Sequence, residues 1–253
     1  MSSYIIRNGE LCEGVAPLVG VAYVCQSIHA CRHKPQNLAA HIAVAAGAAR
    51  RLFGVEYKAD AVQIDALCRR MLAANHYPDE VSSEIIMKIY PSGEVRFECG
   101  EILVHNGLVV RAIRPEATCM SYDLPFGDEP TSARVAAHEL ALSMARVQGF
   151  RSVVRASSEG LLSDIDTSPL FLVKDDVIHT PLARKSVERE IVLHLAQSAG
   201  VEVVERNIHF NELATADELF CFDYRGLTAL GSCDGKHYMD LVARRIGRTS
   251  LKR

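Results

Sequence analysis

The sequence predicts an α+β protein with two domains, because helix-like and strand-like segments alternate without a regular βαβ order. Apolar residues recur at helical spacing over residues 38–53 and again over 186–199. Two strand-like runs, Glu84–Tyr90 and Glu94–Cys99, are joined by a Pro-Ser-Gly turn. These segments require both sheet and helix in one chain of 253 residues, a length sufficient for two modest cores.

The domain boundary is predicted where periodicity stops. Residues 118–130 contain two prolines, one glycine and no helical or alternating pattern, which is typical of a linker. We therefore expect a small N-terminal α+β domain over residues 1–117. A larger C-terminal α/β domain is expected over residues 131–253.

Helix ends follow from capping residues. Gly54 ends the helix predicted for residues 38–53, and Asp60 is positioned to cap the next one. A further helix is expected from Thr131 or Ser132 to Gly149. Its spacing predicts that four apolar residues face inward. They are Ala137, Leu140, Ala141 and Met144.

Bulk composition excludes several classes of function. Hydrophobic residues make up 49% and charged residues 23% of the chain, as in ordinary globular proteins. A net charge of −3 argues against a nucleic-acid partner. No N-terminal apolar run has the form of a signal peptide or a membrane span, so we expect no membrane partner and a cytoplasmic location. The eight cysteines lack CxxC spacing, which favours free thiols in a reducing compartment.

One group of cysteines and histidines raises the question of a metal site. Cys25, His29, Cys31 and His33 occupy odd positions and would lie on one face of a strand. Thiolate and imidazole suit zinc, but residues two apart on a strand are too far splayed to share one ion easily. A strand with one polar face is the favoured interpretation, and we expect no metal.

Six segments in order carry a family resemblance. They are Asn8-Gly9-Glu10-Leu11, the helix at 38–53, the helix ending at Gly149, the run Leu170–Asp175, Thr180-Pro181, and Ala216–Phe220. Together they resemble the class IV (fold-type IV) pyridoxal-phosphate enzymes. This family includes branched-chain and D-amino-acid aminotransferases and aminodeoxychorismate lyase. The resemblance implies a two-domain fold like that of D-amino-acid aminotransferase, pyridoxal phosphate as cofactor, and a homodimer.

The resemblance also implies a catalytic lysine, and the chain lacks it. Counting back from Gly149 places the family's Schiff-base lysine at Pro130, and no lysine occurs between Lys88 and Lys174. Proline cannot form an aldimine or shuttle a proton. We therefore assign no catalytic residue. Lys174 and Lys185 are the nearest lysines that could be borrowed, and neither is where the cofactor's aldehyde should point.

The other positions at which the family holds its cofactor are mostly altered here. The resemblance places Asp164 where a glutamate would hold the pyridine nitrogen, although a polar turn residue is an equal alternative. Val44 stands where the family has an arginine. The remaining candidate cofactor positions are Val187, Glu188 and Arg189 at a helix start, and Asp223, Tyr224 and Arg225 in a turn. Added acids beside a phosphate argue against tight binding, whereas Arg225 could compensate.

Substrate residues are less defined. Lys88 lies on a strand where family members often have an arginine facing the substrate carboxylate, and a lysine on the strand's wet face is the favoured alternative. Tyr224 is the second substrate candidate.

Three hypotheses about function remain open. They differ on whether the chain is an enzyme. The first is a divergent member that is degenerate for transamination, has no cofactor, and binds a small molecule, regulates, or pairs with an active paralogue. The second is a pyridoxal-phosphate-dependent aminotransferase or lyase with an atypical site. The third is cofactor-free chemistry using Asp164, Asp223, Tyr224 or Arg189.

Overall fold

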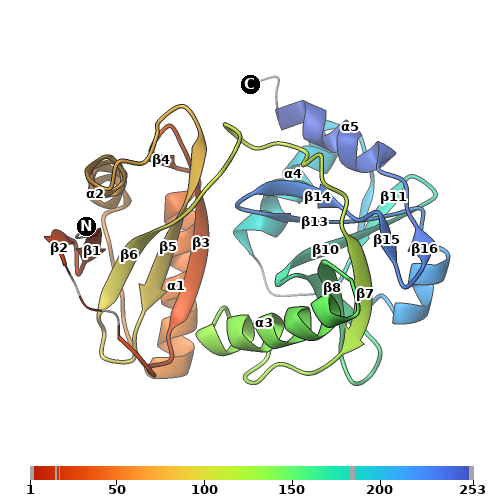
Figure 1. The fold of residues 1–253 in the computed structure, drawn as a ribbon, viewed down its shortest axis with the longest axis horizontal. Helices are drawn as coiled ribbons and strands as arrows, with labels where there is room; N and C mark the ends of the chain where they lie inside the picture. The colour runs from red at the N-terminus through yellow and green to blue at the C-terminus, as the bar shows by residue number, and fades with distance from the viewer. Residues whose placement is uncertain (1–2, 15, 17, 183–185, 251–253) are drawn as a thin grey trace. The chain divides into compact units, whose positions relative to one another are not determined.

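The computed structural model describes residues 3–14, 16, 18–182 and 186–250 and has the α+β class expected from the sequence. It divides into two compact units (Figure 1). The N-terminal unit comprises Met1–Gly107 and Glu129–Ser132, and the C-terminal unit comprises Leu108–Asp128 and Ala133–Arg253. Each unit has its own sheet and its own buried apolar cluster.

This division differs from the linker predicted over residues 118–130. Strand β7 (Glu116–Ser121) runs through the first part of that stretch and pairs in parallel with β8 (Ser152–Ala156). Residues 129–132 return to the N-terminal unit, where the carbonyl of Pro130 accepts a hydrogen bond from the Cys25 amide at 2.8 Å. The proline and glycine content marks irregular chain correctly, but pairing with a strand far along the sequence leaves no local pattern.

The N-terminal unit is a six-stranded antiparallel sheet with the order β2-β1-β6-β5-β3-β4. Its strands are β1 (Tyr4–Arg7), β2 (Glu10–Glu13), β3 (Val24–Cys31), β4 (Lys34–Pro35), β5 (Ser82–Ile89) and β6 (Val95–Ile102). Two helices, α1 (Leu38–Phe53) and α2 (Ala61–Ala74), pack on one face and enclose an apolar core. The polar side chains of these strands therefore lie on the opposite face of the sheet.

Both N-terminal helices follow their predicted ends. Gly54 ends α1 with φ 68°, a left-handed conformation that glycine adopts at little steric cost. Asp60 caps α2 by accepting a hydrogen bond from the Val62 amide at 2.9 Å. Local capping chemistry was sufficient for these predictions.

The C-terminal unit is built on a ten-stranded mixed sheet. Eight strands follow the order β12-β11-β10-β9-β8-β7-β15-β16, and β13 pairs with both β10 and β14. The strands not yet given are β9 (Leu162–Ile165), β10 (Ser168–Lys174), β11 (Val177–Thr180), β12 (Val203–Glu205), β13 (Glu218–Asp223), β14 (Gly226–Ala229), β15 (Ser232–Cys233) and β16 (Lys236–His237). Strand β10 is central, since it pairs with β9 at its start and with β11 and β13 further on.

Three α-helices and a 3-10 turn complete this unit: α3 (Ser132–Val147), α4 (Val187–Ser198), η1 (Phe210–Ala214) and α5 (Leu241–Ser250). Helices α4 and α5 pack on each other and on β13, around an apolar cluster that includes Phe171 and Phe220. The two rings stack with centroids 5.1 Å apart. Among the described residues, no helix has both the length and the apolar character needed to cross a bilayer.

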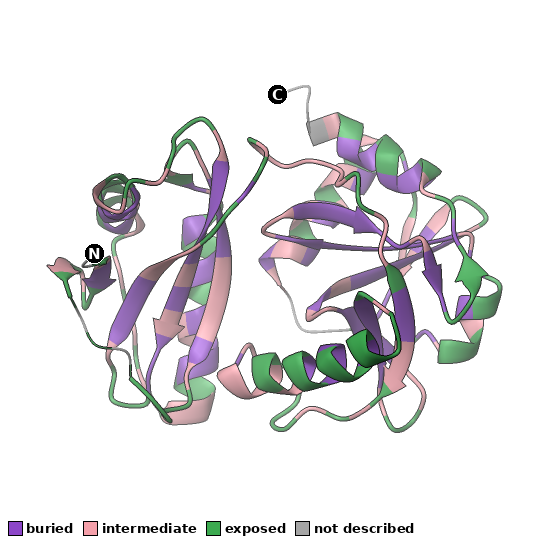
Figure 2. Cartoon of the chain, in the orientation of Figure 1, coloured by how far each residue is buried: buried purple, intermediate pink, exposed green. Residues whose placement is uncertain are grey.

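The inward face predicted for α3 is wrong in part. Leu140 and Met144 are 65% and 53% exposed, whereas the buried face consists of His138, Ala141, Leu142 and Ala145 (Figure 2). Apolar residues occur on two sides of this helix, so helical spacing alone fits either side. Packing against β8 and the loop around Tyr122 selects the face carrying the small alanines.

Candidate functional site

The centre of the candidate site is a buried ion pair between two neighbouring strands. Arg155 on β8 and Asp164 on β9 lie directly opposite each other in the antiparallel ladder. The Arg155 guanidinium donates to Asp164 Oδ2 from Nε at 2.8 Å and from Nη2 at 2.6 Å. The two side chains are only 6% and 5% exposed. Cross-strand partners share one face of a sheet, which holds the pair in this geometry.

A second arginine reaches the same carboxylate. Arg134, in the first turn of α3, donates from Nη2 to Asp164 Oδ2 at 3.2 Å and to the Thr167 carbonyl at 3.0 Å. Arg155 also pairs with Asp128 at 3.2 Å and lies over the ring of Tyr122. The charge of Asp164 is thus matched by the protein's own guanidinium groups.

Helix α4 begins beside a second acidic side chain. The Ser186 side chain accepts a hydrogen bond from the Arg189 amide at 3.1 Å, as an N-cap does. Burial raises the pKa of the Glu188 carboxyl, and the charge of Asp223 raises it further. Hydrogen bonds from the Glu188 amide itself and from Ser186, together with the charge of Arg134, act in the opposite direction. Glu188 is thus an acid in the first turn of α4.

The other two candidates in this turn serve the fold. Val187 is buried. Arg189 is also buried, and its Nη2 pairs with Glu205 Oε2 at 2.9 Å and donates to the Pro181 carbonyl at 3.3 Å. These contacts tie α4 to β12 and to the strand end at Thr180. The Arg189 charge is therefore committed to a carboxylate of the chain.

The turn between β13 and β14 is closed by its own ion pair. Asp223 accepts from the Arg225 amide at 2.7 Å and from Arg225 Nε at 2.9 Å. Burial alone lowers the pKa of Arg225, but the adjacent Asp223 raises it more, so the net change is upward. The guanidinium lies over the ring of Tyr224, 5.3 Å from its centroid. The positive charge of Arg225, expected to compensate for added acids near a phosphate, is paired with Asp223 inside this turn.

Lys174, a candidate substitute for the missing lysine, lies far along β10. Pro169 pairs with Asp164, and Lys174 is five residues further on, a distance of roughly 16 Å at strand rise. Its amine is 3.7 Å from Asp217 and points to that acid. Lys185 lies outside the described residues.

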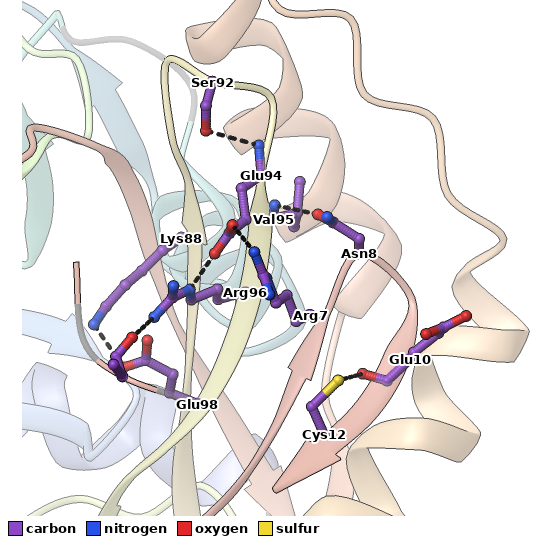
Figure 3. Close-up of polar contacts among 11 residues, drawn as sticks. Arg7, Asn8, Glu10, Cys12, Lys88, Ser92, Glu94, Val95, Arg96 and Glu98 are labelled. Atoms are coloured by element: carbon purple, nitrogen blue, oxygen red, sulfur yellow. Dashed lines mark hydrogen bonds and ion pairs between the residues drawn. The ribbon is translucent and has the colours of Figure 1, made fainter. Parts of the chain in front are cut away.

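Lys88 belongs to the polar face of the N-terminal sheet (Figure 3). Its Nζ is 2.6 Å from Glu98 Oε2 on β6 and 5.2 Å from the centroid of the Tyr23 ring. Burial alone lowers the pKa of Lys88, but the bond to Glu98 contributes to a net rise. Beside it, Arg96 pairs with Glu94. The side chain is a partly buried, paired cation.

The residues considered for zinc do not converge. His29 and Ser82 share a hydrogen bond of 3.1 Å, His33 meets the Tyr77 carbonyl at 2.7 Å, and Cys31 donates to Asn106 at 2.9 Å. Within the ranges that the structure describes, no three His, Cys, Asp or Glu side chains form a metal-binding group.

Comparison with known proteins decides the family. The model of the family described as amino-transferase class IV matches residues 27–222, more than half of the chain. The chain belongs to the class IV aminotransferase family.

Its homologues include branched-chain aminotransferases. The chain is 33% identical over 101 residues to branched-chain-amino-acid aminotransferase 5, chloroplastic, of Arabidopsis thaliana, covering 38% of this chain and 24% of that enzyme. It is 33% identical over 85 residues to a putative branched-chain-amino-acid aminotransferase of Methanocaldococcus jannaschii, covering 32% and 30%. The matched stretch thus spans less than a third of either relative.

Solved structures show the same fold along the whole chain. A branched-chain aminotransferase from Thermoproteus uzoniensis superposes with a TM-score of 0.83 at 17% identity, covering 100% of this chain and 94% of that one. An aminotransferase from Brucella abortus, solved with pyridoxal phosphate, gives 0.80 at 19% identity, covering 99% and 98%. The fold-type IV architecture expected from the sequence is confirmed. The low sequence identities show that the chain is a divergent member of the class IV aminotransferase family.

At two positions where the family resemblance places cofactor contacts, the structure shows acids of the chain itself. The carboxylate that would face a pyridine nitrogen is bound by two arginines, and a carboxyl group lies at the helix start that would face a phosphate. The sequence singled out Asp164 but gave no indication of Arg134 and Arg155, which bind its carboxylate. Arg155 could have been found only from the register of β8 against β9, for which the sequence carries no signal.

Proposed function

We propose that this member of the class IV aminotransferase family does not carry out lysine-dependent transamination. Instead, it acts as a binding or regulatory protein, or as the partner of an active paralogue. The observation that carries this proposal is the absence of any lysine between Lys88 and Lys174, with Pro130 at the position where the family resemblance places the Schiff-base lysine. The ion pair between Asp164 and Arg155 supports it, since an acid matched by arginine is a poor partner for a protonated ring nitrogen.

The first experiment tests for an aldimine. Purified protein is titrated with pyridoxal phosphate, and its visible absorption is followed before and after borohydride. Because no lysine of the described chain contacts Asp164, we expect no aldimine band beyond that of a denatured sample, and no reduced adduct at a single lysine by peptide mass spectrometry. A lysine-bearing class IV aminotransferase serves as the positive control.

A stoichiometric reduced adduct would contradict the proposal. The lysine that carries the adduct would also distinguish between hypotheses. An adduct at Lys185 or Lys174 would favour the alternative of an aminotransferase or lyase with an atypical site. Adducts spread over many surface lysines, equal to those of the denatured sample, agree with the proposal.

The expected homodimer is part of the same proposal, and helix α3 supports it. Ala136, Leu140, Met144 and Val147 form an exposed apolar stripe opposite the buried face, spanning roughly 16 Å of helix. In an antiparallel pairing of two copies, Glu139 of one helix would lie near Arg146 of the other. Apolar stripes flanked by complementary charge are typical of association surfaces.

Light scattering on an eluting column tests the dimer. We expect twice the chain mass of 27.8 kDa for the unmodified protein. The variant Leu140→Asp should shift the mass to that of a monomer. Val62→Asp, at a 79% exposed position on α2, is the matched control and should leave the dimer intact. A monomeric unmodified protein would refute this part of the proposal.

We also propose a cytoplasmic protein with a small-molecule ligand and with neither nucleic acid nor membrane as partner. The net charge of −3 supports this, as do eight free cysteines. Their burial raises the pKa of several thiols, that of Cys99 to about 11 and that of Cys68 to about 12, which suits unreactive core thiols.

A further inference from the structure

The exposed side of helix α5 carries three arginines and a leucine. These four residues recur at spacings of three and four, which places them on one stripe of the helix (Figure 2): Leu241, Arg244, Arg245 and Arg248. They line an open hollow of about 200 Å³ on the surface of the C-terminal unit. This hollow shares no residue with the ion pair of Asp164 and Arg155, so it is a second candidate site.

The charge of this region is opposite to that of the rest of the chain. Residues 236–253 contain six lysines or arginines and one aspartate, a net charge of +5. Since the whole chain carries −3, the first 235 residues carry −8. Like charges three and four residues apart on a helix repel each other. The stripe is therefore electrostatically unfavourable by itself, and a bound anion would relieve the repulsion.

The chain itself uses the three arginines to different extents. Arg244 Nε pairs with Asp240 Oδ2 at 2.8 Å, and the Arg244 side chain is 56% exposed. Arg245 Nη2 donates to the Ala199 carbonyl at 2.9 Å, at the end of α4. Among the described residues, no ion-pair or hydrogen-bond partner meets the Arg248 side chain. Arg248 is thus available to an external anion, and Arg244 is paired at the surface, where exchange of partners is easy.

The two acids at the start of α5 leave most of this positive charge in place. The oxygens of Glu218 accept hydrogen bonds from the first amides of the helix. Asp240 bonds to Arg244 and also lies 3.6 Å from Arg114 Nε, so two guanidinium groups share one carboxylate. Arg245 and Arg248 receive no compensating charge from either acid.

The residues that line the hollow indicate the chemistry of its ligand. The planar guanidinium group donates paired hydrogen bonds to phosphate oxygens, and several arginines together favour an anion with more than one charge. Leu241 is 67% exposed and adds an apolar wall, to which the aliphatic stems of the arginines contribute. The volume is below that of an ordinary drug-sized pocket, so it suits a compact molecule.

We propose that the hollow on α5 binds a small phosphate ester with an apolar portion. Arg248 and Arg244 hold the phosphate, and Leu241 contacts the apolar portion. This inference rests on the proposed function, because it supplies the small-molecule site of a binding protein. It requires neither a lysine nor an aldehyde on the ligand.

Calorimetric titration with phenyl phosphate, and separately with inorganic phosphate, tests the site at low ionic strength. We expect one molecule of phenyl phosphate per chain. Arg248→Gln should weaken binding of both probes by at least about fivefold, and the double variant with Arg244→Gln by at least about tenfold, because charge-assisted bonds to phosphate are lost. Leu241→Ala should weaken binding of phenyl phosphate and leave that of inorganic phosphate unchanged.

Arg50→Gln is the matched control. Arg50 is exposed in the last turn of α1, as Arg248 is in the last turn of α5, and each is placed to complement a helix dipole. Its change removes the same charge from an equivalent helix end and should leave the affinity for both probes unchanged. Equal weakening by Arg50→Gln and Arg248→Gln would mean that net charge governs binding, and would overturn the proposal.

Three other results would also overturn it. They are no binding of phenyl phosphate by the folded protein, an affinity that Arg248→Gln leaves intact, and binding of a poly-glutamate peptide in place of either phosphate, which would indicate an acidic protein partner. Neither probe carries an aldehyde, so these outcomes leave the proposal on aldimine formation standing. Conversely, a reduced lysine adduct with pyridoxal phosphate would refute that proposal without changing the response of phenyl phosphate to Arg248→Gln.

Discussion

Asp164→Ala should destabilise the C-terminal unit by about 3–5 kcal/mol, the cost of removing one partner from a buried ion pair. Among the described residues, Arg155 would keep only Asp128, whose side chain is 41% exposed, as a carboxylate partner. Its guanidinium would otherwise remain buried without compensation. Chemical denaturation measures the free energy of unfolding, and amide exchange along β8, β9 and β10 shows whether the loss is confined to this unit.

A surface pair on the other unit is the control. Asp65 and Arg69 are 2.7 Å apart on α2, and the Arg69 side chain is 48% exposed, so Asp65→Ala should cost less than about 0.5 kcal/mol. The double variant Asp164→Leu with Arg155→Met should recover most of the lost stability, since apolar replacements of a buried pair are often neutral. If Asp164→Ala costs no more than Asp65→Ala, the carboxylate is not holding the unit together.

Glu218→Ala should release helix α5 and cost about 3–4 kcal/mol, because hydrogen bonds to a charged group contribute roughly 1.5–3 kcal/mol each. Glu218 is buried on β13, and its two oxygens accept from the Val242 amide at 2.7 Å and the Ala243 amide at 3.0 Å. Its loss leaves both first-turn amides of α5 without their acceptors. Faster amide exchange in α5, with a lower midpoint of denaturation, would be the measured result.

The neighbouring acid provides a comparison for this prediction. Asp217 accepts from the Asp175 amide at 2.9 Å but is 34% exposed, so Asp217→Ala should cost about 1 kcal/mol. Glu218→Gln keeps one oxygen acceptor and should fall between the two. Similar destabilisation by Asp217→Ala and Glu218→Ala would contradict the capping role of Glu218.

One segment that carried the family resemblance also has a structural role. Glu218 belongs to the Ala216–Phe220 segment that carried the resemblance, and its hydrogen bonds hold a helix onto the sheet. Arg189, at the start of α4, likewise pairs with Glu205 of β12. These two residues therefore serve the fold.

Much of the local structure could be predicted. The helix over Leu38–Phe53 has the predicted bounds, and Asp60 caps the helix that it was expected to cap. Capping and periodicity depend on residues within one or two turns, so they can be read from sequence. The exposed side of α3 could not be predicted, because the helix carries apolar residues on two sides and only packing against the rest of the unit decides which side is buried.

The site was predicted as a set of positions without their partners. Asp164 and Arg225 were identified, but their pairing with Arg155 and Asp223 required a strand register and a turn conformation. The register of β8 against β9 depends on contacts between strands, which leave no local pattern in the chain. Their charges are therefore neutralised within the protein, which the sequence could not show.

The sequence by itself determined the family, the α+β class and the absence of any lysine between Lys88 and Lys174, because each depends on which residues are present and in what order. The tertiary structure decided where the remaining charges go. Strand pairing brings Arg155 to Asp164, and the turn between β13 and β14 brings Arg225 to Asp223. Burial makes such pairings exclusive, since a charge removed from water must be satisfied by whichever partner the fold places beside it.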